Sequence, residues 1–134
     1  MNYWLIKSEP SVYSFEQLKK DKRTAWTGVR NYSARNNLRA MKKGDLCLYY
    51  HSNEGLCVVG VAKVVREFYQ DPTTDDKNWV CVDVSPTLTF KKPVTLSQIK
   101  ADEVLKNMQF VRLGRLSVSV VTEDEYQRIN RLSQ

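Results

Sequence analysis

Apolar and polar residues alternate along several short segments of the chain, with the period of two that is typical of β-strands. The segments with this pattern, which we predict to be strands, are 3–7, 46–51, 56–68, 79–84 and 116–120. Residues 52–55, Ser-Asn-Glu-Gly, join two of them and indicate a hairpin turn. The run 56–68 is apolar on both faces, so we expect it near the centre of a sheet. Gly60 and Ala62 lie on one of its faces and would let another element pack closely.

Other segments have the spacing of helices. Ser14 is expected to be the N-cap of a helix that begins at Phe15, with Gln17 as the third residue of a capping box. Residues 95–104 also suit a helix, and residues 123–132 suit a closing amphipathic helix.

A further short helix is predicted to carry apolar and basic residues on neighbouring faces. The residues at this spacing are Ala34, Leu38 and Met41 on the apolar face, and Arg35, Arg39 and Lys42 on the basic face. If the apolar face docks on the core, the three cations point outward. Gly44 is expected to end this helix in the left-handed cap conformation.

Short, non-local strands with a few small helices predict a compact, barrel-like α+β domain. A chain of 134 residues that is 42% hydrophobic is long enough for one domain, residues 1–134, with a single core. No apolar run approaches the roughly 20 residues of a membrane span. The first residues do not resemble a signal peptide, so we expect a cytoplasmic protein.

The three cysteines, Cys47, Cys57 and Cys81, occur in alternating apolar segments and form no C-x-x-C pair. His51 is the single histidine. Since a structural zinc site needs about four Cys or His ligands, we expect no metal. The cysteines are expected to be buried, reduced thiols.

The charge pattern adds a candidate function. The net charge is +6, and no Asp or Glu occurs between Lys22 and Gly44, whereas seven Lys or Arg do. Within this stretch, residues 26–36 hold two aromatic residues, two arginines and two asparagines. Aromatic rings stack on bases, Asn reads base edges and Arg neutralises phosphates, so this composition suits nucleic acid. The alternative is a solvated loop whose Trp26 fills the core.

Polar candidates also occur near the ends of predicted strands. They are Lys7-Ser8-Glu9-Pro10, Tyr49 to Ser52, and Arg115 with Ser117. Alternation places Tyr49 and His51 on one face, which we interpret as pocket-like, and Leu48 and Tyr50 on a core-like face. The alternatives are an ordinary turn at Lys7, a structural histidine, and a barrel rim that carries arginines.

Taken in order, these segments resemble the EVE domain, a member of the PUA-like superfamily that also includes the PUA, YTH and ASCH domains. The matching pieces, which span nearly the whole chain, are 3–10, 26–36, 44–52, 60–62, 79–84 and 115–118. Thr27 departs from the family pattern, because many EVE sequences carry Asp or Glu there. Gly114 also departs, since a bulkier polar residue is common at that position.

The resemblance implies an α+β fold, a five- or six-stranded pseudo-barrel with short helices at its edges. It also implies a pocket for a flipped, modified base, such as a modified cytosine in DNA or RNA. The residues expected around the base are Lys7, Ser8, Trp26, Val29, Arg30, Asn31, Tyr32, Tyr49, His51, Ser52, Arg115 and Ser117. Those expected at backbone phosphates are Arg35, Arg39 and Lys42. We expect a monomer without a cofactor.

Two other functions remain open at this point. One is a small hydrolase of modified nucleosides, similar to ASCH relatives, in which Lys7 and Glu9 are catalytic. The other is an interaction module whose basic segment serves only solubility. We favour the non-enzymatic reader of a modified base, because no nucleophile–base pair is recognisable in the sequence.

Overall fold

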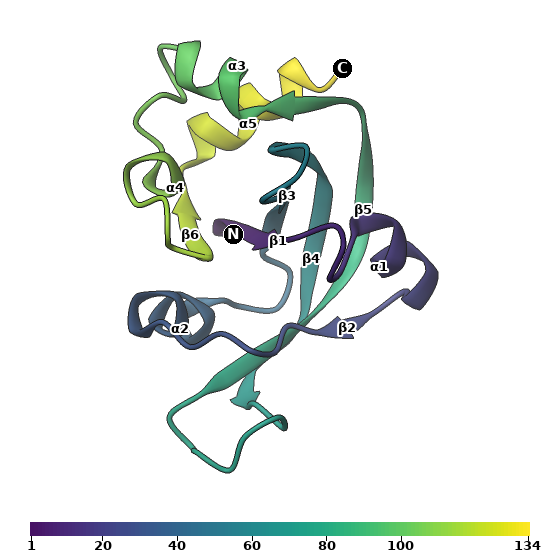
Figure 1. The fold of residues 1–134 in the computed structure, drawn as a ribbon, viewed down its shortest axis with the longest axis vertical. Coiled ribbons are helices and arrows are strands. Elements are labelled where there is room, and N and C mark those ends of the chain that lie inside the picture. The colour runs from purple at the N-terminus through teal and green to yellow at the C-terminus, as the bar shows by residue number, and fades with distance from the viewer.

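The computed structural model describes all 134 residues and contains a six-stranded open sheet (Figure 1). The strands are β1 (Tyr3–Ser8), β2 (Thr24–Ala25), β3 (Leu46–His51), β4 (Cys57–Gln70), β5 (Val80–Thr95) and β6 (Val118–Val121). They lie in the order β2-β5-β4-β3-β1-β6. The β1–β3 pair is parallel, and every other neighbouring pair is antiparallel. The expected α+β class and strand number are confirmed.

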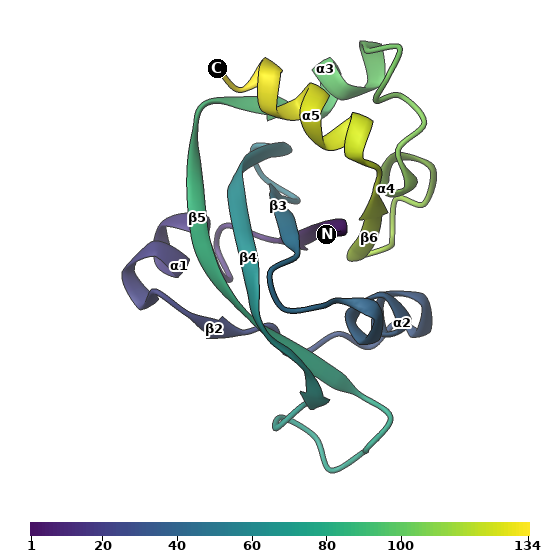
Figure 2. The same ribbon diagram turned by 180° about the vertical axis from the view of Figure 1, so that it is seen from behind.

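The hairpin of β4 and β5 runs the length of the molecule and bends as it does so (Figures 1 and 2). Its pairing shifts register at several points, which lets the two long strands curve. The sequence predicted the last of these strands to end at Val84, but β5 continues to Thr95. Pro86 is tolerated because it lies opposite Ala62 at one of the register shifts.

Five short helices cover the sheet. They are α1 (Phe15–Asp21), α2 (Tyr32–Ala40), α3 (Leu96–Ala101), α4 (Gln109–Arg112) and α5 (Glu123–Leu132). Ser14 caps α1 as expected, since its Oγ accepts the N–H of Gln17 at 3.0 Å. The capping box is not reciprocal, because the Gln17 amide donates to Asp21 instead. Helix α2 ends at Ala40, earlier than expected, and Gly44 has its positive φ of +97° in the turn that follows.

The helix predicted over residues 95–104 is shorter in the structure. After α3 ends, the carboxylate of Asp102 accepts the N–H groups of Val104 and Leu105, which turns the chain away from the helix. Helix α4 was not predicted, because a single helical turn leaves no periodic pattern to detect.

Apolar side chains pack on both faces of the sheet, so two core clusters replace the single core that we expected. The adjacent residues Tyr49 and Tyr50 of β3 belong to different clusters. The cluster of Tyr49 lies under α1 and α2, and that of Tyr50 lies under α3, α4 and α5. The close approach expected at Gly60 is confirmed, because a Cβ there would lie 2.6 Å from the Phe15 ring.

The three cysteines are free thiols. Cys47 and Cys81 are buried as expected, but Cys57 is only half-buried because it begins β4 at the end of the sheet. No three side chains of His, Cys, Asp or Glu are grouped as ligands for one metal ion. None of the helices has the length and apolar character needed to cross a bilayer.

Candidate nucleic-acid interface

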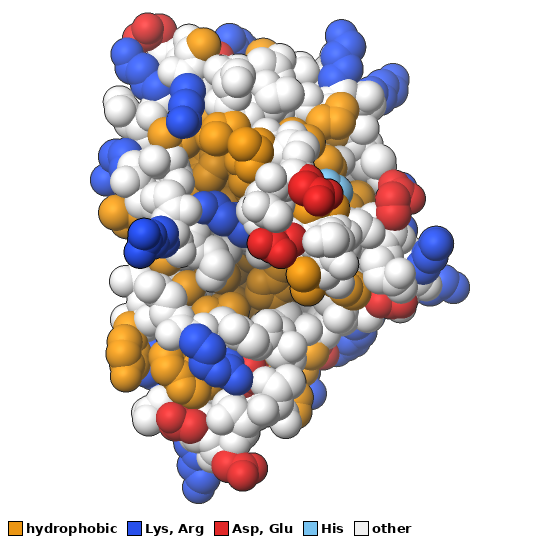
Figure 3. All heavy atoms as spheres, viewed as in Figure 1, with side chains coloured by type: hydrophobic (Ala, Val, Ile, Leu, Met, Phe, Trp, Pro, Cys, Tyr) orange, Lys and Arg blue, Asp and Glu red, His pale blue; other side chains and the backbone are white.

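A pocket of about 570 Å³ opens between the end of β1, the loop before α1, and β2 with the segment that joins it to α2. Figure 3 shows the surface hollowed in this region, with hydrophobic side chains at the bottom and Lys or Arg side chains at the margins. The lining residues are Lys7, Ser8, Val12, Tyr13, Thr24, Ala25, Trp26, Thr27, Gly28, Val29, Arg30, Asn31 and Ser117. Seven residues that the sequence placed around a base line it: Lys7, Ser8, Trp26, Val29, Arg30, Asn31 and Ser117. Their contact with a base stays a prediction.

Trp26 lines the pocket and also belongs to the core. Its side chain is only 8% exposed and packs in the cluster that contains Tyr49. Its ring meets Tyr49 edge-on at 5.4 Å between centroids, and meets Tyr13 in the same way at 6.3 Å. The backbone N–H of Trp26 donates to the backbone carbonyl of Val82 at 2.7 Å, which holds the residue over the sheet. Trp26 therefore fills the core, as the alternative interpretation of residues 26–36 expected, and only a small part of its side chain faces the pocket.

A buried carboxylate fixes the segment that follows Trp26. Asp71, which is 0% exposed, accepts the N–H of Gly28 at 2.8 Å and Nη1 of Arg30 at 3.0 Å through the same oxygen. Its other oxygen accepts the N–H and hydroxyl of Thr73. Burial raises the pKa of the Asp71 carboxyl, but the hydrogen bonds from Thr73, Gly28 and Arg30 outweigh it and lower that pKa to about 2. The ionised carboxylate thus holds one wall of the pocket in place.

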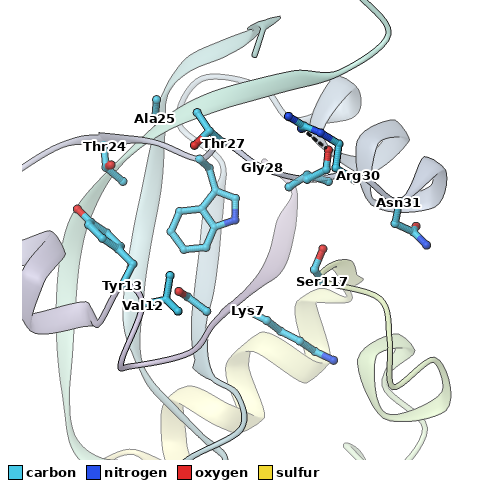
Figure 4. Close-up of a pocket in the computed structure, with 13 residues that line it drawn as sticks. Lys7, Val12, Tyr13, Thr24, Ala25, Thr27, Gly28, Arg30, Asn31 and Ser117 are labelled. Atoms are coloured by element: carbon cyan, nitrogen blue, oxygen red, sulfur yellow. Dashed lines mark hydrogen bonds between the residues drawn. The ribbon is translucent and has the colours of Figure 1, made fainter. Parts of the chain in front are cut away.

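The same segment leads directly into α2. Gly28 adopts a positive φ of +83°, which favours glycine at this turn. Asn31 is the N-cap of α2, and its Oδ1 accepts the N–H of Ala34 at 3.0 Å. Its amide nitrogen remains as the donor available to a ligand. Figure 4 shows Arg30 and Asn31 on one side of the pocket and Lys7 and Ser117 facing them.

The end of β1 forms the facing wall. The N–H of Lys7 donates to the Ser117 carbonyl at 3.0 Å, and its Nζ donates to the Gly114 carbonyl at 2.9 Å. Burial lowers the pKa of the Lys7 ammonium. Glu9, the second residue of the hydrolase alternative, is exposed and shares no hydrogen bond or ion pair with Lys7. The two residues do not form a catalytic pair in this structure.

Tyr49 and His51 lie behind the pocket and do not line it. Tyr49 is fully buried, and its hydroxyl donates to the Tyr13 carbonyl at 2.7 Å. Nε2 of His51 accepts the N–H of Phe15 at 3.2 Å, and burial lowers the pKa of this imidazole. The pocket-like face predicted on β3 is core, because α1 covers it.

Three other predicted residues lie beside the pocket. Tyr32 is exposed on the first turn of α2. Arg115 lines a neighbouring hollow of about 340 Å³, which shares Asn31 with the pocket. Ser52 lines a third hollow of about 270 Å³, which shares Lys7 with it. Together these hollows extend the concave surface away from Trp26.

The cations of α2 differ in their exposure. Lys42 is exposed beyond the helix end, as predicted. Arg35 is half-buried, and its guanidinium donates to the side chain of Asn36. Arg39 is also half-buried, and its Nε is buried without a hydrogen-bond partner. Of the three cations predicted to point outward, Lys42 is exposed, whereas Arg35 and Arg39 are partly covered.

Sequence reasoning missed the residues that shape the pocket from elsewhere in the chain. Asp71, Val12 and Tyr13 were not among the residues predicted for the site. The Asp71-Pro72-Thr73 sequence did carry a local signal, because Asp commonly accepts the N–H two residues later in a turn. Nothing local indicated that the other carboxylate oxygen would bind Gly28.

Comparison with known proteins places this chain in a family. Residues 2–132 match the EVE domain model. Thymocyte nuclear protein 1 from mouse is 37% identical, and the match covers 99% of this chain and 74% of that protein. The chicken protein is 35% identical, with 98% and 69% covered.

Solved structures agree with this match. A crystal structure of a protein from Agrobacterium tumefaciens has a TM-score of 0.96 at 47% identity, covering 99% of this chain and 93% of that one. Human thymocyte nuclear protein 1, in complex with DNA that contains 5-methylcytosine, has a TM-score of 0.92 at 33% identity, covering 100% and 98%. An ASCH protein from Zymomonas mobilis has a TM-score of 0.61 at 13% identity, so it shares only the fold. The chain belongs to the EVE domain family.

Proposed function

We propose that this protein binds nucleic acid and accepts a modified base, such as a modified cytosine, in the pocket beside Trp26. The observation that carries the proposal is a preformed pocket with aromatic and polar walls in a chain that superimposes on the human relative. That relative was crystallised with DNA containing 5-methylcytosine.

The size and chemistry of the pocket support this assignment. Its volume of about 570 Å³ lies within the range of about 300–1,000 Å³ that is usual for small-ligand sites. Tyr13 and the small exposed part of Trp26 offer aromatic surface, while Ser8, Asn31 and Ser117 offer polar groups for a base edge. Flipping a base out of a duplex costs a few kcal/mol, and stacking recovers about 1–3 kcal/mol.

A methyl group on the base would add a modest preference. Val12 and Val29 line the pocket and can contact such a group. Burying one methyl-sized group is worth about 0.8 kcal/mol, which corresponds to about a fourfold difference in affinity. We expect discrimination of about this size between cytosine and 5-methylcytosine, with larger effects for modifications that also form a hydrogen bond.

Backbone binding would come from the basic surface around the opening. The net charge of +6 favours a polyanion, and Arg30 and Arg115 lie at the pocket and at the hollow beside it. Lys42 lies at the far end of α2. These cations contact phosphate and carry no sequence information.

The proposal is tested by measuring affinity for matched oligonucleotides with cytosine or modified cytosine, as DNA and as RNA. The variant Ser117→Phe fills the pocket with an aromatic ring. The matched control is Ser97→Phe, at an exposed position of α3. We expect Ser117→Phe to abolish the preference for the modified base, and Ser97→Phe to leave it unchanged. Equal affinity of the wild-type protein for modified and unmodified strands across the panel would contradict the proposal.

A further inference from the structure

A surface cluster of two aromatic rings and two arginines adjoins the pocket; we call it the platform, formed by Tyr32, Trp79, Arg30 and Arg35. Tyr32, on the first turn of α2, is 66% exposed. Its ring centroid lies 5.2 Å from that of Trp79, and the ring planes are 32° apart. A tyrosine ring that packs against Trp79 and is still this open to solvent offers a surface on which another flat group can stack.

The guanidinium groups flank these rings. Cζ of Arg35 lies 4.9 Å from the Tyr32 centroid and 5.9 Å from the Trp79 centroid. Cζ of Arg30 lies 5.7 Å from the Trp79 centroid. Two cations beside an open aromatic face match a nucleotide, which carries a flat base and an anionic phosphate.

Arg30 connects the platform with the pocket, because the same side chain lines one and contacts the other. Asn31, which also lines the pocket, directly precedes Tyr32 in the chain. The two surfaces are therefore neighbours, and a strand that leaves the pocket can reach Tyr32 with its next nucleotide. Figure 3 shows hydrophobic and basic side chains side by side below the hollow, in the region of α2 in Figure 1.

The charges around the platform favour an anion at the arginines. Asp71 is buried, and its ionised oxygens are occupied by Gly28, Arg30 and Thr73. Asp76 belongs to the same loop as Trp79, and its carboxylate accepts the N–H of Asn78. Arg30 is paired with Asp71, whereas Arg35 forms no ion pair, so Arg35 supplies the uncompensated charge for a phosphate.

We propose that Tyr32 is a second base-binding subsite, which stacks the unpaired base next to the modified one on the same strand. Arg30 and Arg35 contact the phosphate between the two nucleotides. This inference rests on the proposed function, because it takes the pocket as the site of the first base. It predicts that the protein binds a strand with an unpaired neighbour more tightly than the modified nucleoside alone.

The test uses short single strands with a central 5-methylcytosine, whose neighbours either carry bases or are abasic. Abasic neighbours keep the phosphates and remove only the rings, so they separate stacking from charge. Tyr32→Ala removes the platform ring, and Tyr32→Phe keeps it. Phe68→Ala is the matched control, because Phe68 is 48% exposed and makes none of the platform contacts.

We expect the wild-type protein and Tyr32→Phe to lose about tenfold in affinity when the neighbours are abasic. Tyr32→Ala is expected to bind the complete strand about tenfold more weakly, to show no further loss with abasic neighbours, and to bind 5-methyl-2′-deoxycytidine as the wild type does. Phe68→Ala is expected to behave as the wild type.

Equal wild-type affinity for complete and abasic strands would overturn the subsite. A loss in Tyr32→Ala that is the same for both strands would also overturn it, since Tyr32 would then act without the base. A different result concerns the pocket alone. If methylated and unmethylated strands bind equally well while the flanking bases still matter through Tyr32, the modified-base proposal fails and the platform stands.

Discussion

Asp71 and Arg30, 41 residues apart in the chain, join the β4–β5 loop to the pocket wall through a contact of 3.0 Å. The carboxylate is fully buried, while the Arg30 side chain is 40% exposed, so the pair reaches from the interior to the surface. The same carboxylate oxygen holds the N–H of Gly28. One side chain thereby fixes both the backbone and a cation of the proposed site.

Replacing Asp71 with Asn should loosen this wall. The variant keeps the size of the side chain but removes its charge and leaves donors on Gly28, Arg30 and Thr73 poorly paired. We expect the free energy of unfolding to fall by about 1–3 kcal/mol. Urea denaturation measures the loss, and Asp75→Asn, at an exposed position of the same loop, is the control. A stability unchanged from the wild type would contradict the role of Asp71.

The stabilising effect of Asp71 should also depend on pH. Its pKa is about 2 in the folded protein, below the value of about 3.9 for an unperturbed Asp. Because the folded pKa is the lower one, the ionised group stabilises the fold above about pH 4, and this contribution disappears as the pH falls towards 2. The difference in stability between wild type and Asp71→Asn should therefore shrink over this window. Denaturation curves collected at several pH values check it.

Trp26→Ala should damage both the fold and the pocket. A side chain that is 8% exposed and packed against Tyr13 and Tyr49 leaves a cavity when it is truncated. We expect a loss of about 3–5 kcal/mol in the free energy of unfolding, as is usual for large aromatic residues in a core. Calorimetry measures the change, and the exposed Phe68→Ala is the control. A melting temperature equal to that of the wild type would show that Trp26 is a surface residue.

His51 should remain neutral at physiological pH. Its Nε2 accepts a hydrogen bond from Phe15, and burial lowers its pKa below the ordinary value of about 6.5. Since the folded pKa is the lower one, we expect stability to fall as the pH decreases from about 6.5 towards that pKa. The chain has one histidine, so an NMR titration of the ring reports the pKa directly. A ring that titrates at or above 6.5 would exclude this arrangement.

The cations of α2 should set part of the salt dependence of binding. Neutralising Arg35 and Lys42 by Gln removes two charges on the surface that leads away from the pocket. We expect the slope of log affinity against log salt on duplex DNA to decrease by about 0.9 for each phosphate that the variant no longer neutralises. Lys106→Gln, far along the chain and paired with Glu103, is the control. An unchanged slope in the double variant would remove α2 from the interface.

The parts of this fold that sequence predicts are those with local signals. Alternation located β1, β3 and β4, and Ser14 marked the start of α1, because these features depend on neighbouring residues. The extension of β5 past Pro86 depends on a register shift against β4, which no local pattern encodes.

The site shows the same division. The run from Trp26 to Asn36 was identified by composition, and the structure places its first six residues, 26–31, on the pocket. Tyr49 was misplaced because alternation tells which residues share a face, but not that α1 covers that face. Asp71 was missed because its partner Gly28 lies 43 residues away. Long-range contacts of this kind require the tertiary structure.

The most direct test of the central claim follows the modified base itself. DNA containing a ¹³C-methyl-labelled 5-methylcytosine, mixed with the protein, allows NMR contacts to the methyl protons to be observed. If the base enters the pocket, the methyl resonance should shift and show contacts to protons of Val29 or Trp26, and Ser117→Phe should abolish them. A methyl resonance that keeps its free-duplex position in the bound complex would contradict the account.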